Sequence, residues 1–341
     1  GNVTISGGTI TEASGGYMAA GIGSGYQGLG TVTIEGDAVI KNAQGGEAGA
    51  GIGSGTYGDS EIIIRGDAVI ENAESSGNGA GIGSGQGDLY PDGDGMVIDP
   101  TVGNVTIEGN AKIENAKSGY GGSGIGGGAI GIGNVIIRGN AQIGNATGGE
   151  EGAGIGGGAL GTGDVTIEGN VTIENAQGGA GAAGIGGGAE TEPDTEDTRN
   201  KVSIKSTEAG SPNITAKGGG VLKDENAPLA GAAAIGSGSV ADGATEVKSD
   251  ITVEGKVTIN ATGGGDVAIG DSINGETQFS GLQVGTTITR RNAKGDDVSQ
   301  PGDVPEPEKP AQPEKPEDAA PEAPEAEQPE APAEEAPAEA P

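Results

Sequence analysis

The sequence predicts an all-β fold: a single-stranded parallel β-helix solenoid of about eight coils of about 30 residues, followed by a disordered Pro/Glu-rich tail. An isoleucine set between glycines returns at spacings of 30, 30, 43, 30, 30, 50 and 34 residues, a period typical of stacked repeats. The composition agrees, because 75 of 341 residues are Gly and only 2% are aromatic, too few large side chains for a spherical core. The recurring isoleucines are Ile22, Ile52, Ile82, Ile125, Ile155, Ile185, Ile235 and Ile269.

The first segment of each coil reads Val-Thr-Ile or a close variant. Side chains alternate between the two faces of a strand, so the first and third residues point into the coil. The middle residue and the residue after the segment point outward. These segments are residues 3–5, 32–34, 62–64, 105–107, 135–137, 165–167, 202–204 and 251–253.

The second segment follows a Gly corner and runs into Asn-Ala, and the third is the Ala-Gly-Ile-Gly phrase. Gly on both sides of the buried Ile allows positive φ angles and close approach of neighbouring backbones. Three short strands per coil therefore stack in register, and the chirality rule for parallel strands favours a right-handed coil. The second segments include residues 39–40, 69–70, 112–113, 142–143 and 172–173.

The outward residue after the first segment supports this register. From the second coil onward its charge alternates in sign at every coil, and stacked neighbours of opposite charge stabilise a sheet. We interpret the series as a structural ladder of ion pairs. Its members are Ser6, Glu35, Arg65, Glu108, Arg138, Glu168, Lys205 and Glu254.

A second ladder follows the second segment and consists mainly of asparagine. The Asn amide can bond both to the backbone and to the next Asn, and Asn tolerates turn conformations. We again predict a structural role. The positions are Glu12, Asn42, Asn72, Asn115, Asn145, Asn175, Thr215 and Asn260.

Composition and charge exclude several classes of function. The chain has no His or Cys, which removes the usual ligands of zinc, haem and iron–sulfur sites and the usual members of catalytic triads. The formal net charge is −33, so no nucleic-acid partner is expected. No apolar run approaches the ~20 residues of a membrane span, so no membrane insertion is expected. We expect a soluble, monomeric surface protein.

The 43-residue spacing contains an acidic insertion near residues 87–102. The segment Asp92-Gly93-Asp94-Gly95 resembles part of a calcium loop, and carboxylate oxygens suit Ca²⁺. Asp88, Asp92 and Asp94 are therefore candidate calcium ligands, with a solvated acidic loop as the alternative. No other cofactor is expected. A second acidic insertion lies near residues 190–200.

The tyrosines are candidate ligand-binding residues. Tyr26 and Tyr57 follow the Gly-Ile-Gly corner in successive coils, Tyr17 and Tyr120 precede it, and Tyr90 lies in the first insertion. Aromatic side chains on one edge of a rod can stack on sugar rings or anchor a partner. They can equally shield the edge of the rod. The residues predicted to bind ligand are Tyr26, Tyr57, Tyr90 and Tyr120.

Two regions divide the chain, a β-helix over residues 1–290 and an acidic Pro-rich linker over residues 291–341. Residues 301–341 hold 12 of the 17 prolines, in Glu-Lys-Pro and Glu-Ala-Pro units. Proline removes a ladder donor and glutamates repel one another, so this segment is expected to be extended and unpacked. It resembles the Pro-Glu-Lys-Pro spacers of proteins exposed on Gram-positive bacterial walls.

The segment 3–11, Val-Thr-Ile-Ser-Gly-Gly-Thr-Ile-Thr, and the Gly-Ile-Gly phrases resemble the right-handed β-helix domains of clostridial-type bacterial surface proteins. The resemblance covers about residues 1–290. It implies an extracellular location at the bacterial cell surface or wall. It also implies carbohydrate binding, with calcium and pectin-like polysaccharides as ligands.

The favoured interpretation is a non-catalytic, adhesin-like or glycan-binding surface module projected by a wall-spanning spacer. Its partner would be a polysaccharide, or a glycan or protein on a host or bacterial surface. A polysaccharide lyase or hydrolase on the same scaffold is the first alternative; Arg199, beside Asp194 and Asp197, is its candidate residue. A structural stalk with no ligand and an ice-binding rod with an outward Thr column are the others.

Overall fold

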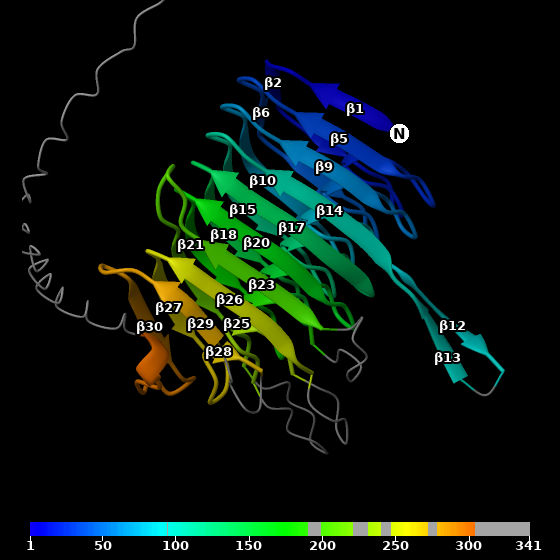
Figure 1. Ribbon diagram of the computed structural model, residues 1–341. Coiled ribbons are helices and arrows are strands. Elements are labelled where there is room, and N and C mark those ends of the chain that lie inside the picture. Colours follow the sequence, from blue (N-terminus) through cyan, green and yellow to red (C-terminus); the bar gives the residue numbers. More distant parts are fainter. Residues whose placement is uncertain (94, 190–198, 221–230, 240–246, 272–277, 304–341) are drawn as a thin grey trace, which may run out of the picture. The chain divides into compact units, whose positions relative to one another are not determined.

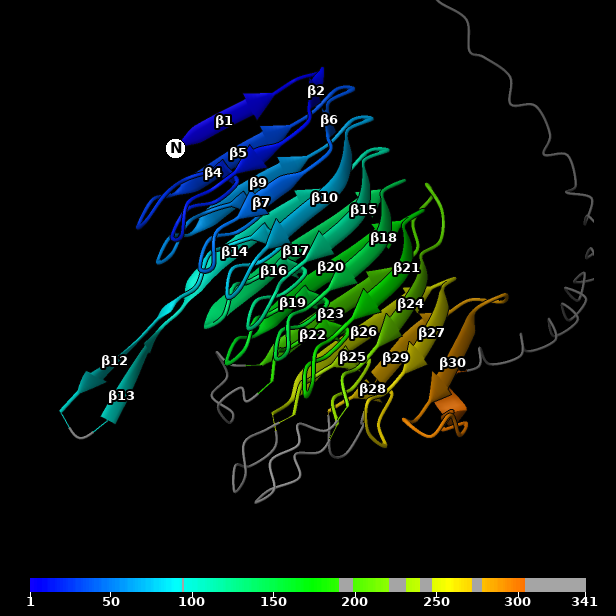
Figure 2. The same cartoon turned by 180° about the vertical axis from the view of Figure 1, so that it is seen from behind.

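The computed structural model describes residues 1–93, 95–189, 199–220, 231–239, 247–271 and 278–303. These residues belong to one compact unit, Gly1–Glu306. Its strands are stacked coil upon coil into three parallel sheets, as the two opposite views of Figures 1 and 2 show. The predicted all-β parallel solenoid is confirmed.

The first sheet contains the Val-Thr-Ile segments. Within the described residues it has nine strands, one per coil, and neighbouring strands are parallel and in register, for example Val3 with Val32 and Ile5 with Ile34. In chain order the strands are β1 (Asn2–Ile5), β5 (Gly30–Ile34), β9 (Ser60–Ile64), β14 (Thr101–Ile107), β17 (Gly131–Gly139), β20 (Gly163–Gly169), β23 (Asn200–Lys205), β26 (Ser249–Gly255) and β29 (Gln278–Leu282).

The second sheet contains the segments that run into Asn-Ala. Its main path is β2 (Thr9–Ile10), β6 (Val39–Ile40), β10 (Val69–Ser75), β15 (Lys112–Lys117), β18 (Gln142–Thr147), β21 (Thr172–Gln177), β24 (Asn213–Lys217), β27 (Thr258–Thr262) and β30 (Thr287–Arg291). In the first two coils the Asn-Ala part forms separate short strands, β3 (Ala13–Ser14) and β7 (Ala43–Gly45).

The third sheet consists of the Ile-Gly pairs of the recurring phrase. Gly53 has a φ of 138°, and a Cβ atom there would overlap the carbonyl oxygen of Gly83 in the next coil. Only Gly permits this approach. The strands are β4 (Ile22–Gly23), β8 (Ile52–Gly53), β11 (Ile82–Gly83), β16 (Ile125–Gly126), β19 (Ile155–Gly156), β22 (Ile185–Gly186), β25 (Ile235–Gly236) and β28 (Ile269–Gly270).

The core is a set of apolar columns that run from coil to coil. Each coil contributes the two inward residues of its first strand, the Ile of the second and the Ile of the third. These side chains fill the narrow interior, so burial does not require aromatic residues. One column, almost fully buried, is Ile34, Ile64, Ile107, Ile137, Ile167 and Ile204.

Both predicted ladders are present on the surface. Arg65 bonds to Glu35 at 2.6 Å, Arg138 to Glu108 at 2.6 Å, and Lys205 to Glu254 at 3.0 Å. Each pair joins neighbouring coils. In the second sheet the amide nitrogens donate along the stack, from Asn115 to Asn72, Asn145 to Asn115, and Asn175 to Asn145, at 3.1, 3.1 and 3.4 Å.

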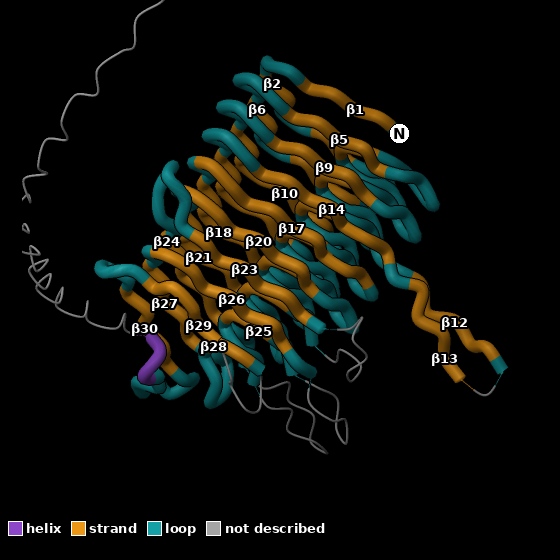
Figure 3. Tube along the Cα trace, viewed as in Figure 1, coloured by secondary structure: helices purple, strands orange, loops and turns teal. Residues whose placement is uncertain are grey.

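The last coil differs from the sequence-based expectation of about eight coils. A ninth first-sheet strand, β29, pairs with β26, and the Val-Thr-Ile pattern did not reveal it because it reads Gln-Phe-Ser-Gly-Leu. β30 pairs with β27, and a short 3-10 helix, η2 (Pro301–Asp303), packs beside it (Figure 3). Residues 304–341, most of the expected linker, lie outside the described residues.

A buried ion pair closes this end of the core. The Arg290 guanidinium lies 2.7 Å from the Asp303 carboxylate, donates a 3.1 Å hydrogen bond to the Ile269 carbonyl, and stands 4.9 Å over the Phe279 ring. Arg290 and Asp303 are 1% and 3% exposed, so the pair takes the place that an apolar side chain has in the other coils.

The insertion of the third coil is an antiparallel hairpin. β12 (Asp88–Asp92) pairs with β13 (Gly95–Asp99), and the ribbon projects from the rod between β11 and β14 (Figure 1). The sequence predicts an acidic insertion here but not its strands. The physical reason for the hairpin is the pairing of Leu89-Tyr90 with Val97-Ile98 across a Pro-Asp-Gly turn, a strand–turn–strand pattern.

Candidate functional site

The loops before and after each third-sheet strand meet at one edge of the rod. Backbone hydrogen bonds join them across neighbouring coils, from Thr56 N to Met18 O at 3.1 Å, and from Gln86 N to Ala48 O at 3.0 Å. We call the apolar surface of these loops in the first coils the tyrosine edge. It consists of Tyr17, Met18, Tyr26, Leu29 and Tyr57, all exposed.

Tyr26 and Tyr57 form the centre of the tyrosine edge. Their ring centroids lie 5.6 Å apart with an interplanar angle of 60°, an edge-to-face contact. Their exposed fractions are 51% and 36%, so both rings present surface to solvent. Among the described residues this is the only close aromatic pair. The edge-to-face arrangement holds the two rings at fixed relative angles.

The backbone of Tyr57 has an uncommon conformation at this corner. Its φ is +58°, a left-handed conformation that non-glycine residues adopt at a cost. Gln27, Ile130 and Leu160 occupy the same corner in other coils, with φ of 54°, 57° and 60°. In the third coil the corner residue is Gly87, whose amide bonds to Ala129 just as the Tyr57 amide bonds to Gln86.

Asp88 connects the tyrosine edge to the hairpin. Its carboxylate accepts a 2.9 Å hydrogen bond from the Leu89 amide, and the backbone amide of Tyr57 bonds to the Gln86 carbonyl, two residues before Asp88. Partial burial of the ring, followed by the hydrogen bond and charge of Asp88, raises the pKa of Tyr57 above its usual value. The shift places the Asp88 carboxylate close enough to Tyr57 to disfavour its anionic form.

The structure separates the other predicted tyrosines from this pair. Tyr120 occupies the position of Tyr17, but three coils further along the rod. In the two coils between them this position is Glu47 and Gly77, and the Tyr120 amide donates to the Gly77 carbonyl at 2.8 Å. Tyr90 lies in the hairpin opposite Val97. Tyr26 and Tyr57 are thus the two members of the predicted set that the fold brings together.

The hairpin places two of the three candidate calcium ligands at opposite ends of one strand. Asp88 and Asp92 are the first and last residues of β12, so their Cα atoms are ~13 Å apart at the rise of a β-strand. Asp94 lies outside the described residues. Within the described part of the chain, no three acidic residues form a group suited to a metal ion.

Arg199, the candidate of the enzyme alternative, bonds to Asp250 in the neighbouring coil at 3.1 Å. Asp194 and Asp197 lie outside the described residues. The pair joins the residue just before β23 to β26 and resembles the other inter-coil ion pairs of the rod.

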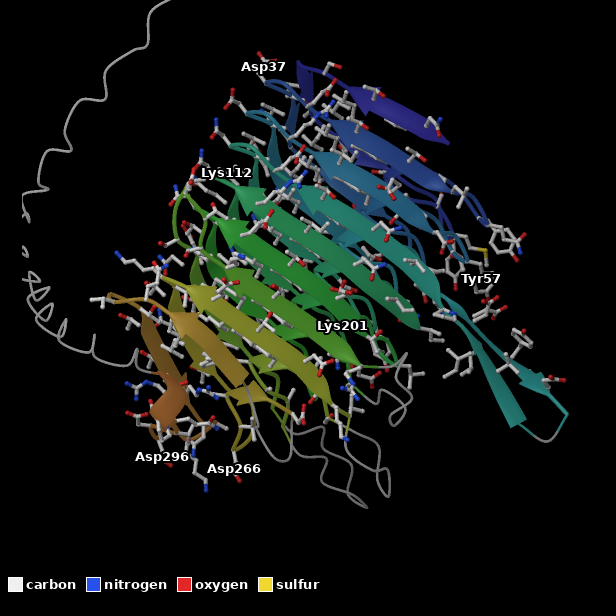
Figure 4. All side chains as sticks on the ribbon, in the orientation of Figure 1. Asp37, Tyr57, Lys112, Lys201, Asp266 and Asp296 are labelled. Carbon is white, nitrogen blue, oxygen red and sulfur yellow. The ribbon has the colours of Figure 1, made fainter. Side chains whose placement is uncertain are left out.

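Sequence reasoning missed three apolar neighbours of the tyrosines. Met18, Leu29 and Leu89 are 42%, 66% and 41% exposed, as large as the aromatic exposures around them. The sequence did hold a signal for them. Met18 and Leu89 are each next to a tyrosine, and Leu29 is at a position that Asp59 has in the next coil. Figure 4 shows Tyr57 at this edge, with Asp37 at the opposite corner of the coil.

Comparison with protein families, with curated proteins and with solved structures found no match to this chain. In the described part of the chain, no helix has the length and apolar character needed to cross a membrane. The tyrosine edge is accordingly judged on its own geometry.

Proposed function

We propose that this protein is a non-catalytic β-helix module of a bacterial cell surface that binds glycans at its tyrosine edge. The observation that carries the proposal is the exposed Tyr26–Tyr57 pair, held edge to face at 5.6 Å on a rigid stack of strands. Binding residues on loops that a rigid scaffold positions are a common arrangement in proteins.

Aromatic rings suit the apolar C–H face of a pyranose sugar. Stacking buries ring and sugar carbon together, while the Tyr hydroxyl remains available for hydrogen bonds. Because the rings already restrain each other through their edge-to-face contact, little side-chain entropy is lost on binding. Met18 and Leu29 extend the apolar surface around the pair.

The positions of the chain's irregular segments also support this edge. The hairpin of residues 88–99 separates a third-sheet strand from the next first-sheet strand. Two longer connections, at residues 190–198 and 240–246, which lie outside the described residues, come between the same two strands of later coils. In solenoids, insertions concentrate on one side, often the binding side. Two other insertions, near residues 208–212 and 221–230, come between other pairs of strands in the sequence.

The finer parts of the proposal rest on the sequence. The acidic Pro-rich segment is a suitable spacer to project a rod from a wall, and the repeat resembles that of clostridial-type surface proteins. A polysaccharide lyase or hydrolase is less favoured, because Arg199 already bonds to Asp250 as part of the scaffold.

A glycan array and pull-down against mucin and plant polysaccharides test the proposal. We expect binding that Tyr26→Ala and Tyr57→Gly each weaken by about tenfold, the effect of losing one stacked ring. Tyr57→Gly is preferred to Ala because Gly is relaxed at a positive φ. Tyr120→Ala is the matched control and should bind normally. Absence of glycan binding, or equal loss in the control, would contradict the proposal.

A further inference from the structure

We infer that the tyrosine edge recognises a polysaccharide of free amino sugars, whose ring stacks on Tyr26 and Tyr57 while its ammonium group meets the Asp88 carboxylate. The inference rests on the proposed function and specifies its ligand class. It differs from the pectin-like, anionic ligands that the sequence resemblance implies.

The charge around the edge favours a cation. The formal net charge is −33. The loops at this edge of the first three coils, residues 15–29, 45–59 and 75–92, contain Glu47, Asp59, Asp88 and Asp92 and no Lys or Arg. An anionic polysaccharide would meet repulsion here, whereas a cationic one is attracted over several ångströms. Figure 4 shows Lys112, one of the basic residues, far from Tyr57 at another corner.

The carboxylate of Asp88 is oriented for such a contact. The Leu89 amide donates to it at 2.9 Å, and the backbone amide of Tyr57 bonds to Gln86, two residues before Asp88. An ionised carboxylate has about four lone-pair positions, so this one donor leaves capacity for an ammonium donor. Charge-assisted hydrogen bonds of this kind are stronger than neutral ones. The nearest acid along the strand, Asp92, lies at the far end of β12.

The two rings add a second attraction for the same ligand. Edge-to-face packing uses the face of only one ring, so at least one aromatic face of the pair remains for a ligand. An aromatic face attracts a cation through its quadrupole and also covers the C–H face of a sugar. A protonated amino sugar satisfies both requirements, while a neutral sugar satisfies only the stacking.

The test is calorimetric titration of the full chain with a glucosamine hexasaccharide and with its N-acetylated counterpart, at mildly acidic pH and low salt. The two sugars share their ring geometry and differ in the ammonium group. We expect the amino form to bind at least about tenfold more tightly. Asp88→Asn should remove this preference while weak binding of the acetylated form persists. Tyr57→Gly should weaken both sugars.

Asp37→Asn is the matched control, an exposed acid at the opposite corner of the coil (Figure 4). It removes the same charge and should leave both affinities unchanged. Circular dichroism should show that Tyr57→Gly and Asp88→Asn keep the β-helix. A direct readout is the pKa of Tyr57 followed by tyrosinate absorbance, which Asp88→Asn should lower because the carboxylate raises it.

Several results would overturn the inference. Equal or tighter binding of the acetylated sugar would leave glycan binding intact but remove the role of charge. Binding of other glycans on the array, with no binding of either hexasaccharide, would also keep glycan binding and overturn the preference for amino sugars. Absence of any glycan binding would overturn both this inference and the proposed function. Equal affinity for a lysine hexapeptide, with the same dependence on Tyr57, would identify a cationic peptide as the ligand class instead. Equal loss in Asp37→Asn would reduce the effect to net charge.

Discussion

At the scale of single residues, four coils have a non-glycine residue in a left-handed conformation after the third strand, namely Gln27, Tyr57, Ile130 and Leu160. Gln27 is exposed and has φ of 54°, yet it is not glycine. The positive φ costs about 1–2 kcal/mol for a non-glycine residue. Glycine would avoid this cost, but it loses more chain entropy on folding, which offsets part of the benefit of the substitution. The corner therefore stores a small strain that substitution can release.

We predict that Gln27→Gly raises the free energy of unfolding by roughly 0.5–1 kcal/mol, because strain relief exceeds the added chain entropy. Gln44→Gly, at an exposed position within strand β7, is the control and should lower it by roughly 0.5–1 kcal/mol. Chemical denaturation of both variants provides the measurement. A loss of stability in Gln27→Gly similar to that of the control would contradict the account.

The charge ladder gives a prediction of pH dependence. The hydrogen bond and charge of Arg65, with a further bond from Ser6, hold the pKa of Glu35 below its usual value. A carboxyl group with a depressed folded-state pKa stabilises the fold above its unfolded pKa. That stabilisation is lost as the pH falls through the folded pKa.

Arg65→Gln should therefore return the pKa of Glu35 toward its ordinary value, as NMR titration of its side chain would show. Arg138→Gln removes the next ion pair along the ladder, between Arg138 and Glu108. It should leave the pKa of Glu35 unchanged. If both variants shift Glu35 equally, the effect is general charge and not the pair.

At the scale of elements, the C-terminal cap depends on one buried ion pair. Arg290 and Asp303 have side-chain exposures of 2% each, so removing one partner leaves an uncompensated buried charge. Breaking such a pair costs about 3–5 kcal/mol. The cap is thus more sensitive than the exposed pairs of the ladder, which contribute at most about 1 kcal/mol.

We predict that Asp303→Asn destabilises the last coils by about 3–5 kcal/mol, seen as faster hydrogen exchange of amides in β27 and β30 with little change in β5 and β9. The double variant Arg290→Met/Asp303→Leu should be less damaged than Asp303→Asn, since both charges are gone. Exchange that speeds up equally along the rod would show that coils do not open from the end.

The elements also show what the sequence alone could supply. Alternation within Val-Thr-Ile predicted which faces are buried, because the strand period is two and every coil repeats it. The hairpin β12–β13 and strand β29 were missed, since neither matches the repeat. The cap was missed because the contact between Arg290 and Asp303 spans a turn of the chain that no local pattern specifies.

At the scale of the whole molecule, stacking of the coils brings together residues that lie about 30 positions apart in the sequence. Tyr26 lies four residues after Ile22 and Tyr57 five residues after Ile52. Their shared position after the Gly-Ile-Gly phrase was therefore predictable. Their ring contact was not, because it depends on the positive φ at Tyr57 and on the stacking of one coil upon the next. The proximity of Asp88 to Tyr57 was likewise not predictable before the hairpin was placed.

The long-range arrangement explains why function should concentrate at one edge. The outer surface of the first sheet carries the charge ladder, and that of the second carries the Asn ladder, both committed to holding coils together. The exposed tyrosines and the hairpin lie by the loops of the third sheet. Scaffold and candidate binding surface are thus separated around the coil.

The most direct test of this account uses the five tyrosines of the chain as reporters. Fluorotyrosine labelling gives one fluorine NMR resonance per ring, assigned through single Tyr→Phe variants. On titration with the tightest-binding glycan, the account predicts shifts of Tyr26 and Tyr57 and an unchanged Tyr120. Shifts confined to Tyr120 or Tyr90, or no shift of any resonance, would contradict it.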